Sequence, residues 1–140
     1  MFDVDGFAND KFGSSVSMAG EFLVVGAPSP TVPGSTYVYR IDSDGSDFVL
    51  LSKIGCPTPA DGDQYGHSVA VTSAGLLVVG AVFLSMGSPN TGATIVYTIA
   101  ETGDLTFESF LPAGMFVLGY VVFQEYVERW IEGLDSFQVG

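Results

Sequence analysis

The sequence predicts a mainly β protein, in which two successive four-stranded antiparallel sheets are followed by a C-terminal amphipathic helix. The first observation is a repeat: "GEFLVVGAP" at 20–28 returns almost unchanged as "AGLLVVGAV" at 74–82. The second is that short alternating or β-branched segments, separated by turn residues, surround each of these runs, which is the pattern of short antiparallel strands. The third is a change after residue 110, where apolar residues recur at helical spacing.

The repeat extends well beyond the apolar run. "DKFGSSV" at 10–16 aligns with "DQYGHSV" at 63–69, and "TYVYRI" at 36–41 aligns with "TIVYTI" at 94–99. The differences in length fall between these segments, in loops where insertions cost little. We therefore treat the chain as two versions of one structural unit.

Each unit reads as four strands in chain order. The first, "SSVSM" or "HSVAV", alternates apolar and polar residues and is expected to be half buried. The second, "FLVVG" or "LLVVG", is apolar on both faces, which predicts a central strand covered on both sides. The third, "TYVYRI" or "TIVYTI", is rich in aromatic and β-branched residues. The fourth, "FVLLSKI" or "LTFESF", follows a hairpin turn, "DSDGSD" or "AETGD".

A four-stranded antiparallel unit that repeats at roughly 50 residues is typical of a β-propeller blade. Phe12-Gly13 and Gly26-Ala27-Pro28 stand at the start of the first unit and after its central strand, and Tyr65-Gly66 and Gly80-Ala81-Val82 take these places in the second. On these motifs the chain resembles the FG-GAP repeat proteins, whose repeat forms the blades of integrin α-subunit propellers and of many bacterial and algal surface proteins. The resemblance implies a scaffold that binds proteins or cations through loops, at a cell surface.

The resemblance covers residues from about 3 to 110, which we divide into blades at about 10–60 and 63–110 within a domain of residues 1–110. Residues 111–140 form a separate tail. A closed propeller needs at least about four blades. Two blades leave three alternatives: a fragment of a larger propeller, a protomer that closes by assembly, or an open two-blade piece held by partners.

Composition limits the partners. Only 14% of the residues are charged and 47% are hydrophobic, whereas soluble domains average about 25% charged, so we expect surface to be buried against other protein subunits or lipid. The net charge is -12 with four Lys and Arg, which excludes nucleic-acid binding and favours basic or cationic partner surfaces. The N-terminus as given lacks the features of a signal peptide, which fits a cytosolic chain or one whose targeting segment is gone. The compartment stays open, because the resemblance implies a cell surface and an accessory subunit would lie at an organelle membrane.

The tail begins with "LPAGMFVLGYVVF" at 111–123, which carries no charge. Val122, Tyr126, Trp130 and Leu134 then recur at four-residue spacing, which predicts an amphipathic helix from about residue 114 or 120 to 134. A membrane span needs about 20 apolar residues, and Gln124 and Glu125 interrupt this run.

Three roles fit such a helix: it covers the open sheet edge, docks into another subunit, or makes membrane contact through residues 111–134. In the last case, Glu125 or Glu128 would be satisfied by a partner, a metal or a chlorophyll magnesium.

The candidate metal ligands are Asp42, Asp44 and Asp47 in the turn "DSDGSD". Ca²⁺ prefers several closely spaced carboxylate and carbonyl oxygens with a glycine for the turn, and the resemblance implies Ca²⁺ at an Asp-rich loop of integrin-type repeats. Here Gly45 falls after the second aspartate, and "ETGD" in the second unit has lost most of the carboxylates. The alternatives are a Ca²⁺ site and a solvated turn, and we expect no other cofactor.

The remaining reactive residues point away from catalysis. His67 is the only histidine and aligns with Ser14, and Cys56 has no basic neighbour that would lower its pKa, so we expect structural or surface roles for both. Asp61 and Asp63, in the linker "ADGD", are expected to accept hydrogen bonds from backbone N–H groups of their turn. The sequence shows no motif of a nucleophilic, phosphate-binding or paired-carboxylate site, so we expect a protein that is not an enzyme.

Two functions follow. The first is a non-catalytic protein-interaction or scaffold module, in which the loops at 28–36 and 82–93 form one contact surface. The second is a small accessory subunit of a larger complex, such as a membrane-embedded photosynthetic or respiratory one, anchored by the apolar C-terminal helix. The residues expected to contact a partner are Val82, Phe83, Leu84 and Met86 in the second loop and Phe116, Tyr120, Tyr126 and Trp130 in the tail.

Overall fold

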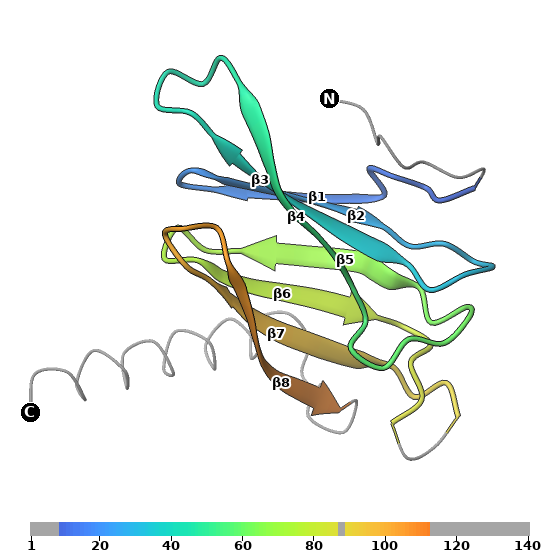
Figure 1. The fold of residues 1–140 in the computed structure, drawn as a ribbon. Helices are drawn as coiled ribbons and strands as arrows, with labels where there is room; N and C mark the ends of the chain where they lie inside the picture. Colours follow the sequence, from blue (N-terminus) through green and yellow to red (C-terminus); the bar gives the residue numbers. More distant parts are fainter. Residues whose placement is uncertain (1–8, 87–88, 113–140) are drawn as a thin grey trace, which may run out of the picture.

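The computed structural model describes residues 9–86 and 89–112, which form two four-stranded antiparallel sheets (Figure 1). The first sheet contains β1 (Ser15–Ala19), β2 (Phe22–Ala27), β3 (Ser35–Ile41) and β4 (Phe48–Gly55). The second contains β5 (Tyr65–Val71), β6 (Leu76–Ala81), β7 (Ala93–Ile99) and β8 (Leu105–Pro112). The spatial order of the strands follows the chain order in both sheets. The two predicted meanders are therefore confirmed, while the predicted helix lies outside the described residues.

The burial of the central strands follows their residue patterns, whereas that of β1 does not. β2 and β6 are buried along their whole length, as expected of strands that are apolar on both faces. β1 alternates as predicted, but in the opposite sense to its apolar pattern: Val16 and Met18 are exposed, while Ser15 and Ser17, which face the second sheet, are half-buried. The two units also share an irregularity, since the register shifts at Val38/Tyr39 in the first sheet and at Val96/Tyr97 in the second.

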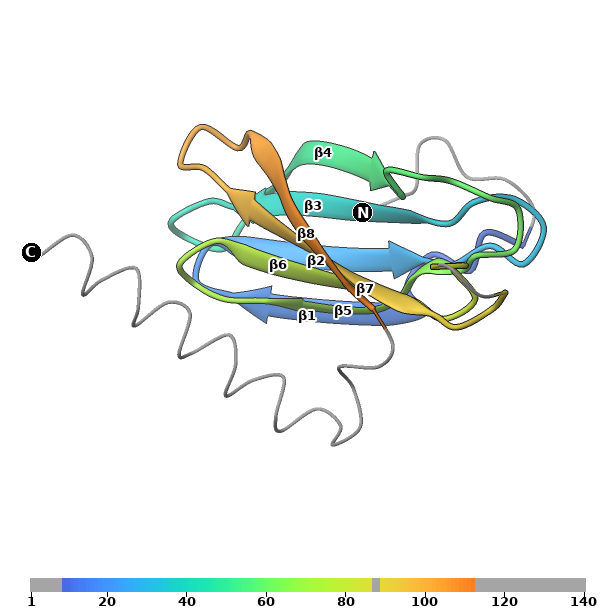
Figure 2. The same ribbon diagram turned by 90° about the horizontal axis from the view of Figure 1, so that it is seen from below.

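The two sheets stack face to face, and β5 contacts both β1 and β2 (Figures 1 and 2). The main core lies between them. Phe22, Val24 and Val38 contribute to it from the first sheet, and the residues from the second sheet include Leu77, Val79, Ile95 and Tyr97. Each blade thus covers one face of its neighbour, which explains why the same apolar strand is needed twice.

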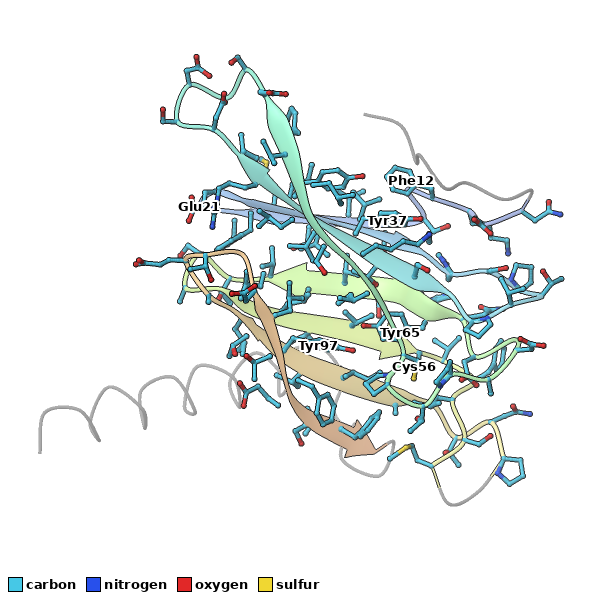
Figure 3. The ribbon with its side chains drawn as sticks, viewed as in Figure 1. Phe12, Glu21, Tyr37, Cys56, Tyr65 and Tyr97 are labelled. Atoms are coloured by element: carbon cyan, nitrogen blue, oxygen red, sulfur yellow. The ribbon has the colours of Figure 1, made fainter. Side chains whose placement is uncertain are left out.

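The outer face of the first sheet, which points away from the second sheet, carries its own apolar cluster. Its buried members are Leu23, Val25, Ala27, Tyr37 and Tyr39. The ring of Phe12 packs edge-on against Tyr37, with 5.1 Å between the ring centroids, and Figure 3 shows the two rings together. Because successive side chains of a strand alternate between faces, β2 supplies both this cluster and the core between the sheets.

Candidate functional site

The junction between the two blades is built on glycines from the two sequence motifs. Gly26 of β2 lies so close to Gly66 of β5 that a Cβ added to Gly26 would lie 2.0 Å from the Gly66 carbonyl oxygen. Gly66 has φ +90°, in the region that favours glycine, and a Cβ there would lie 2.5 Å from the Ser35 carbonyl oxygen. The hydroxyl of Ser15 donates a hydrogen bond of 2.9 Å to the same Gly66 oxygen. The glycine of Tyr65-Gly66, the FG motif of the second unit, therefore meets the first glycine of Gly26-Ala27-Pro28, the GAP motif of the first unit.

Further polar contacts connect the two sheets. The backbone N–H of Val71 donates to the hydroxyl oxygen of Ser17 at 3.1 Å. The guanidinium of Arg40 pairs with Glu21 within the first sheet, at 3.3 Å between Nε and Oε2, and donates through Nη2 to the backbone carbonyl of Glu101 in the second. These contacts give the stacked sheets a defined relative position.

A buried polar group lies in the second sheet, close to the linker between the sheets. The hydroxyls of Tyr65 and Tyr97 are joined by a hydrogen bond of 2.8 Å, and Figure 3 shows Cys56 beside them. Burial raises the pKa of both phenols and of the Cys56 thiol. Cys56 is therefore a protonated, buried thiol at neutral pH, which agrees with the structural role expected of it.

The two predicted contact loops lie at the same end of the stacked sheets (Figures 1 and 2). The linker before β5 and the first residue of β5 join them: Gly34 of the first loop packs against the backbone of Tyr65, and the backbone N–H of Phe83 in the second loop donates to the Asp63 carbonyl at 3.2 Å. Val82 and Phe83 are 38% and 45% exposed. Val32 in the first loop, which no sequence pattern marked as a contact residue, is also 45% exposed.

The prediction for Leu84 is wrong, because this residue is 3% exposed and belongs to the core. Backbone hydrogen bonds from Leu84 to the Ala81 carbonyl and from Gly92 to the Leu84 carbonyl fold the loop back and turn the side chain inward. Met86 packs partly buried against the same core. The tail residues Phe116, Tyr120, Tyr126 and Trp130 lie outside the described residues, so their predicted contacts stay predictions.

A pocket of about 100 Å³ lies beside the first loop. Its lining combines one carboxylate and one ammonium group with small and apolar residues: Asp10, Ala27, Ser29, Val32, Pro33, Ser35 and Lys53. The pocket thus gathers charged and hydroxyl groups at the loop end of the molecule.

The acidic turn between β3 and β4 uses its carboxylates to hold its own backbone. Oδ1 of Asp42 accepts hydrogen bonds from the N–H groups of Ser46 and Asp47, at 3.0 and 3.1 Å, and Oδ1 of Asp44 accepts one from Ser46 at 2.9 Å. Oδ1 of Asp47 accepts a bond from Phe48 N–H at 2.9 Å. Hydrogen bonding from Ser46, first through its side chain and then through its backbone, holds the pKa of Asp44 below its usual value.

Within the part of the chain that the structure describes, no three His, Cys, Asp or Glu side chains are grouped as metal ligands. The bonds of Asp42, Asp44 and Asp47 are those of a self-capped turn, and Ca²⁺ binding there stays a prediction. Asp63 behaves as expected, because its buried carboxylate accepts a bond of 2.8 Å from the backbone N–H of Ala60. His67 is exposed. No helix in residues 9–86 and 89–112 has the length and apolar character of a membrane-crossing segment.

Comparison with known protein families adds one match. Residues 1–39 match the family model of the FG-GAP repeat. The chain carries an FG-GAP repeat. The matched residues include both motifs of the first unit, Phe12-Gly13 and Gly26-Ala27-Pro28, and extend into β3. The second unit repeats the strand order, the register shift and the positive φ of the FG glycine, so it has the structure of the same blade. No curated protein and no solved structure matches the chain.

Proposed function

We propose that the chain is a non-catalytic protein-interaction module, which binds a protein partner through the loop end of its two FG-GAP-type blades. The observation that carries the proposal is Phe83, a 45% exposed aromatic residue directly after Val82, which is 38% exposed. Truncation of such aromatic side chains often costs most of the affinity of an interface, because they bury much apolar area when a partner covers them.

The structure of the loop supports this role. Leu84 is anchored in the core beside the two exposed residues, and the N–H of Phe83 is bonded to Asp63 in the linker. The backbone that presents Phe83 is therefore held in place before any partner binds, which lowers the entropy that binding would cost. Val32 on the first loop adds a further exposed apolar residue at the same end of the molecule.

The test starts with a photo-crosslinking amino acid placed at Phe83 of the full chain in its native cells. The captured protein is then purified and titrated with the wild-type chain, Phe83→Ala and Phe107→Ala. Phe107 is a matched control, because it is also 45% exposed but lies on β8. We expect Phe83→Ala to weaken binding at least about tenfold, or about 1.4 kcal/mol, and Phe107→Ala to leave the Kd unchanged. Equal affinities for the three proteins, or no captured protein, would refute the proposal.

The accessory-subunit alternative depends on residues 111–134, of which the structure describes only 111 and 112 at the end of β8, and it stays a prediction.

A further inference from the structure

Because of the internal repeat, the equivalent face of the first strand occurs twice, once on β1 and once on β5, in different surroundings. Val69 and Val71 of β5 point toward the first sheet, which covers them, and Val71 is 9% exposed. The aligned residues of β1 are Val16 and Met18, which pair with Val25 and Leu23 and so lie on the outer face of the first sheet. They are 59% and 65% exposed. The same strand position is thus covered in the second unit and open in the first.

The cover over β5 is β1 itself. Ser15 and Ser17 point toward the second sheet, where their hydroxyls bond to Gly66 and Val71 of β5. Val16 and Met18 therefore lack a covering strand equivalent to the one that β1 provides for Val69 and Val71. The counterpart of β1 in the second unit is β5, whose Ser68 and Ala70 align with Ser15 and Ser17 and point away from the first sheet.

The chain also carries both halves of a second glycine junction. Gly13 has φ +90°, as Gly66 has, but a Cβ added to Gly13 would meet nothing within 4 Å, whereas one on Gly66 meets Ser35 at 2.5 Å. Gly80 aligns with Gly26, yet the atoms nearest to an added Cβ there all belong to Ser68 on the neighbouring strand, and not to another sheet. Gly13 and Gly80 thus occupy the positions equivalent to Gly66 and Gly26, but among the described residues neither contacts a glycine of another sheet.

We propose that a second copy of this chain stacks head-to-tail on the first, with the outer face of its β5 over Val16 and Met18 of β1. Its Gly80 then meets Gly13, as Gly26 meets Gly66 within one chain, and its Ser68 hydroxyl donates to the Gly13 carbonyl. The proposal extends an interface that the structure already contains, and it uses a surface other than Val82 and Phe83, so it goes beyond the proposed function.

The geometry of such a contact has two consequences. Different surfaces of the two copies meet, so the contact is heterologous, and repeated stacking closes into a ring or grows into a filament. The contact residues named for it, Gly13, Val16, Met18, Ser68, Ala70 and Gly80, carry no charge, whereas each chain carries a net charge of -12. Salt therefore screens repulsion between the copies without breaking an ion pair, and higher ionic strength is expected to favour assembly.

Sedimentation of the full chain over a range of concentrations tests the proposal. We expect wild type to assemble, and Met18→Glu and Ala70→Glu each to be monomeric, because each loses one half of the contact. An equimolar mixture of the two variants keeps one intact half on each molecule and should form dimers but nothing larger. Phe83→Ala should assemble like wild type, which separates this test from that of the proposed function.

Circular dichroism checks that the variants fold, and Ser68→Glu replaces Ala70→Glu if the latter does not, because Ser68 is exposed and Ala70 is half-buried. A wild type that stays monomeric at every concentration would overturn the proposal. So would assembly that survives both substitutions, or folded variants that do not pair with each other.

Discussion

At the scale of single residues, the FG and GAP motifs are explained by one contact. Gly26 and Gly66 approach until no side chain fits between them, and the Ser15 hydroxyl bonds to the Gly66 carbonyl at the same point. The motifs lie about 40 residues apart in the sequence and become one feature only when the blades stack. The sequence reveals both motifs and their repetition, but not that the glycine of one meets the glycine of the other.

Gly26→Ala is expected to destabilise the fold by about 1–3 kcal/mol or more, because the added methyl group would overlap backbone of the neighbouring sheet, which cannot rotate away. Urea unfolding followed by circular dichroism measures the change. Gly55→Ala is the matched control, since its Cβ would meet only the Gly34 carbonyl, at 4.0 Å. Equal stabilities of the two variants would mean that the close approach does not constrain residue 26.

At the scale of elements, the strands agree with their predicted ranges to within one or two residues, because alternation, β-branched residues and turn residues are local signals. The loops agree less well. The apolar stretch after β6 was predicted to face a partner as a whole, but Leu84 turns into the core while Val82 and Phe83 stay exposed. Burial in a loop depends on the path of the backbone, which the residue types of the loop do not encode.

The turn between β3 and β4 carries a prediction at this scale. Asp42→Ala removes the acceptor of the Ser46 and Asp47 N–H groups and is expected to cost about 1 kcal/mol of stability. Thermal unfolding measures it, with Asp61→Ala in the exposed linker as the control.

If the turn is held by these hydrogen bonds alone, millimolar Ca²⁺ leaves the Tm of wild type unchanged. A rise in Tm with Ca²⁺ that Asp42→Ala abolishes would instead establish the alternative, a cation site at Asp42, Asp44 and Asp47.

At the scale of the whole molecule, the largest core belongs to neither blade alone. Phe22, Val24 and Val38 of the first sheet pack with Leu77 and Val79 of the second, and Leu77 and Val79 are fully buried. Removing either sheet would expose this surface to water, so the two blades are expected to unfold as one cooperative unit.

Leu77→Ala is therefore expected to lower the free energy of unfolding by about 2–5 kcal/mol. Native-state hydrogen exchange should show equal losses of protection in β2 and β6, although only β6 carries the substitution. Val49→Ala, at a position that is 54% exposed, should leave the protection nearly unchanged. A loss confined to the second sheet would show that the blades open independently.

The sequence by itself determined the number of strands, their order, the two units and the turns between them. These features depend on neighbours along the chain: side-chain alternation, β-branched residues, and glycine or aspartate where the backbone reverses. Only the tertiary structure decided that Gly26 meets Gly66, that Leu84 is buried and Val32 exposed, and that the outer face of β1 is left open. Each of these depends on residues far apart in sequence, whose distances exist only once the two sheets have stacked.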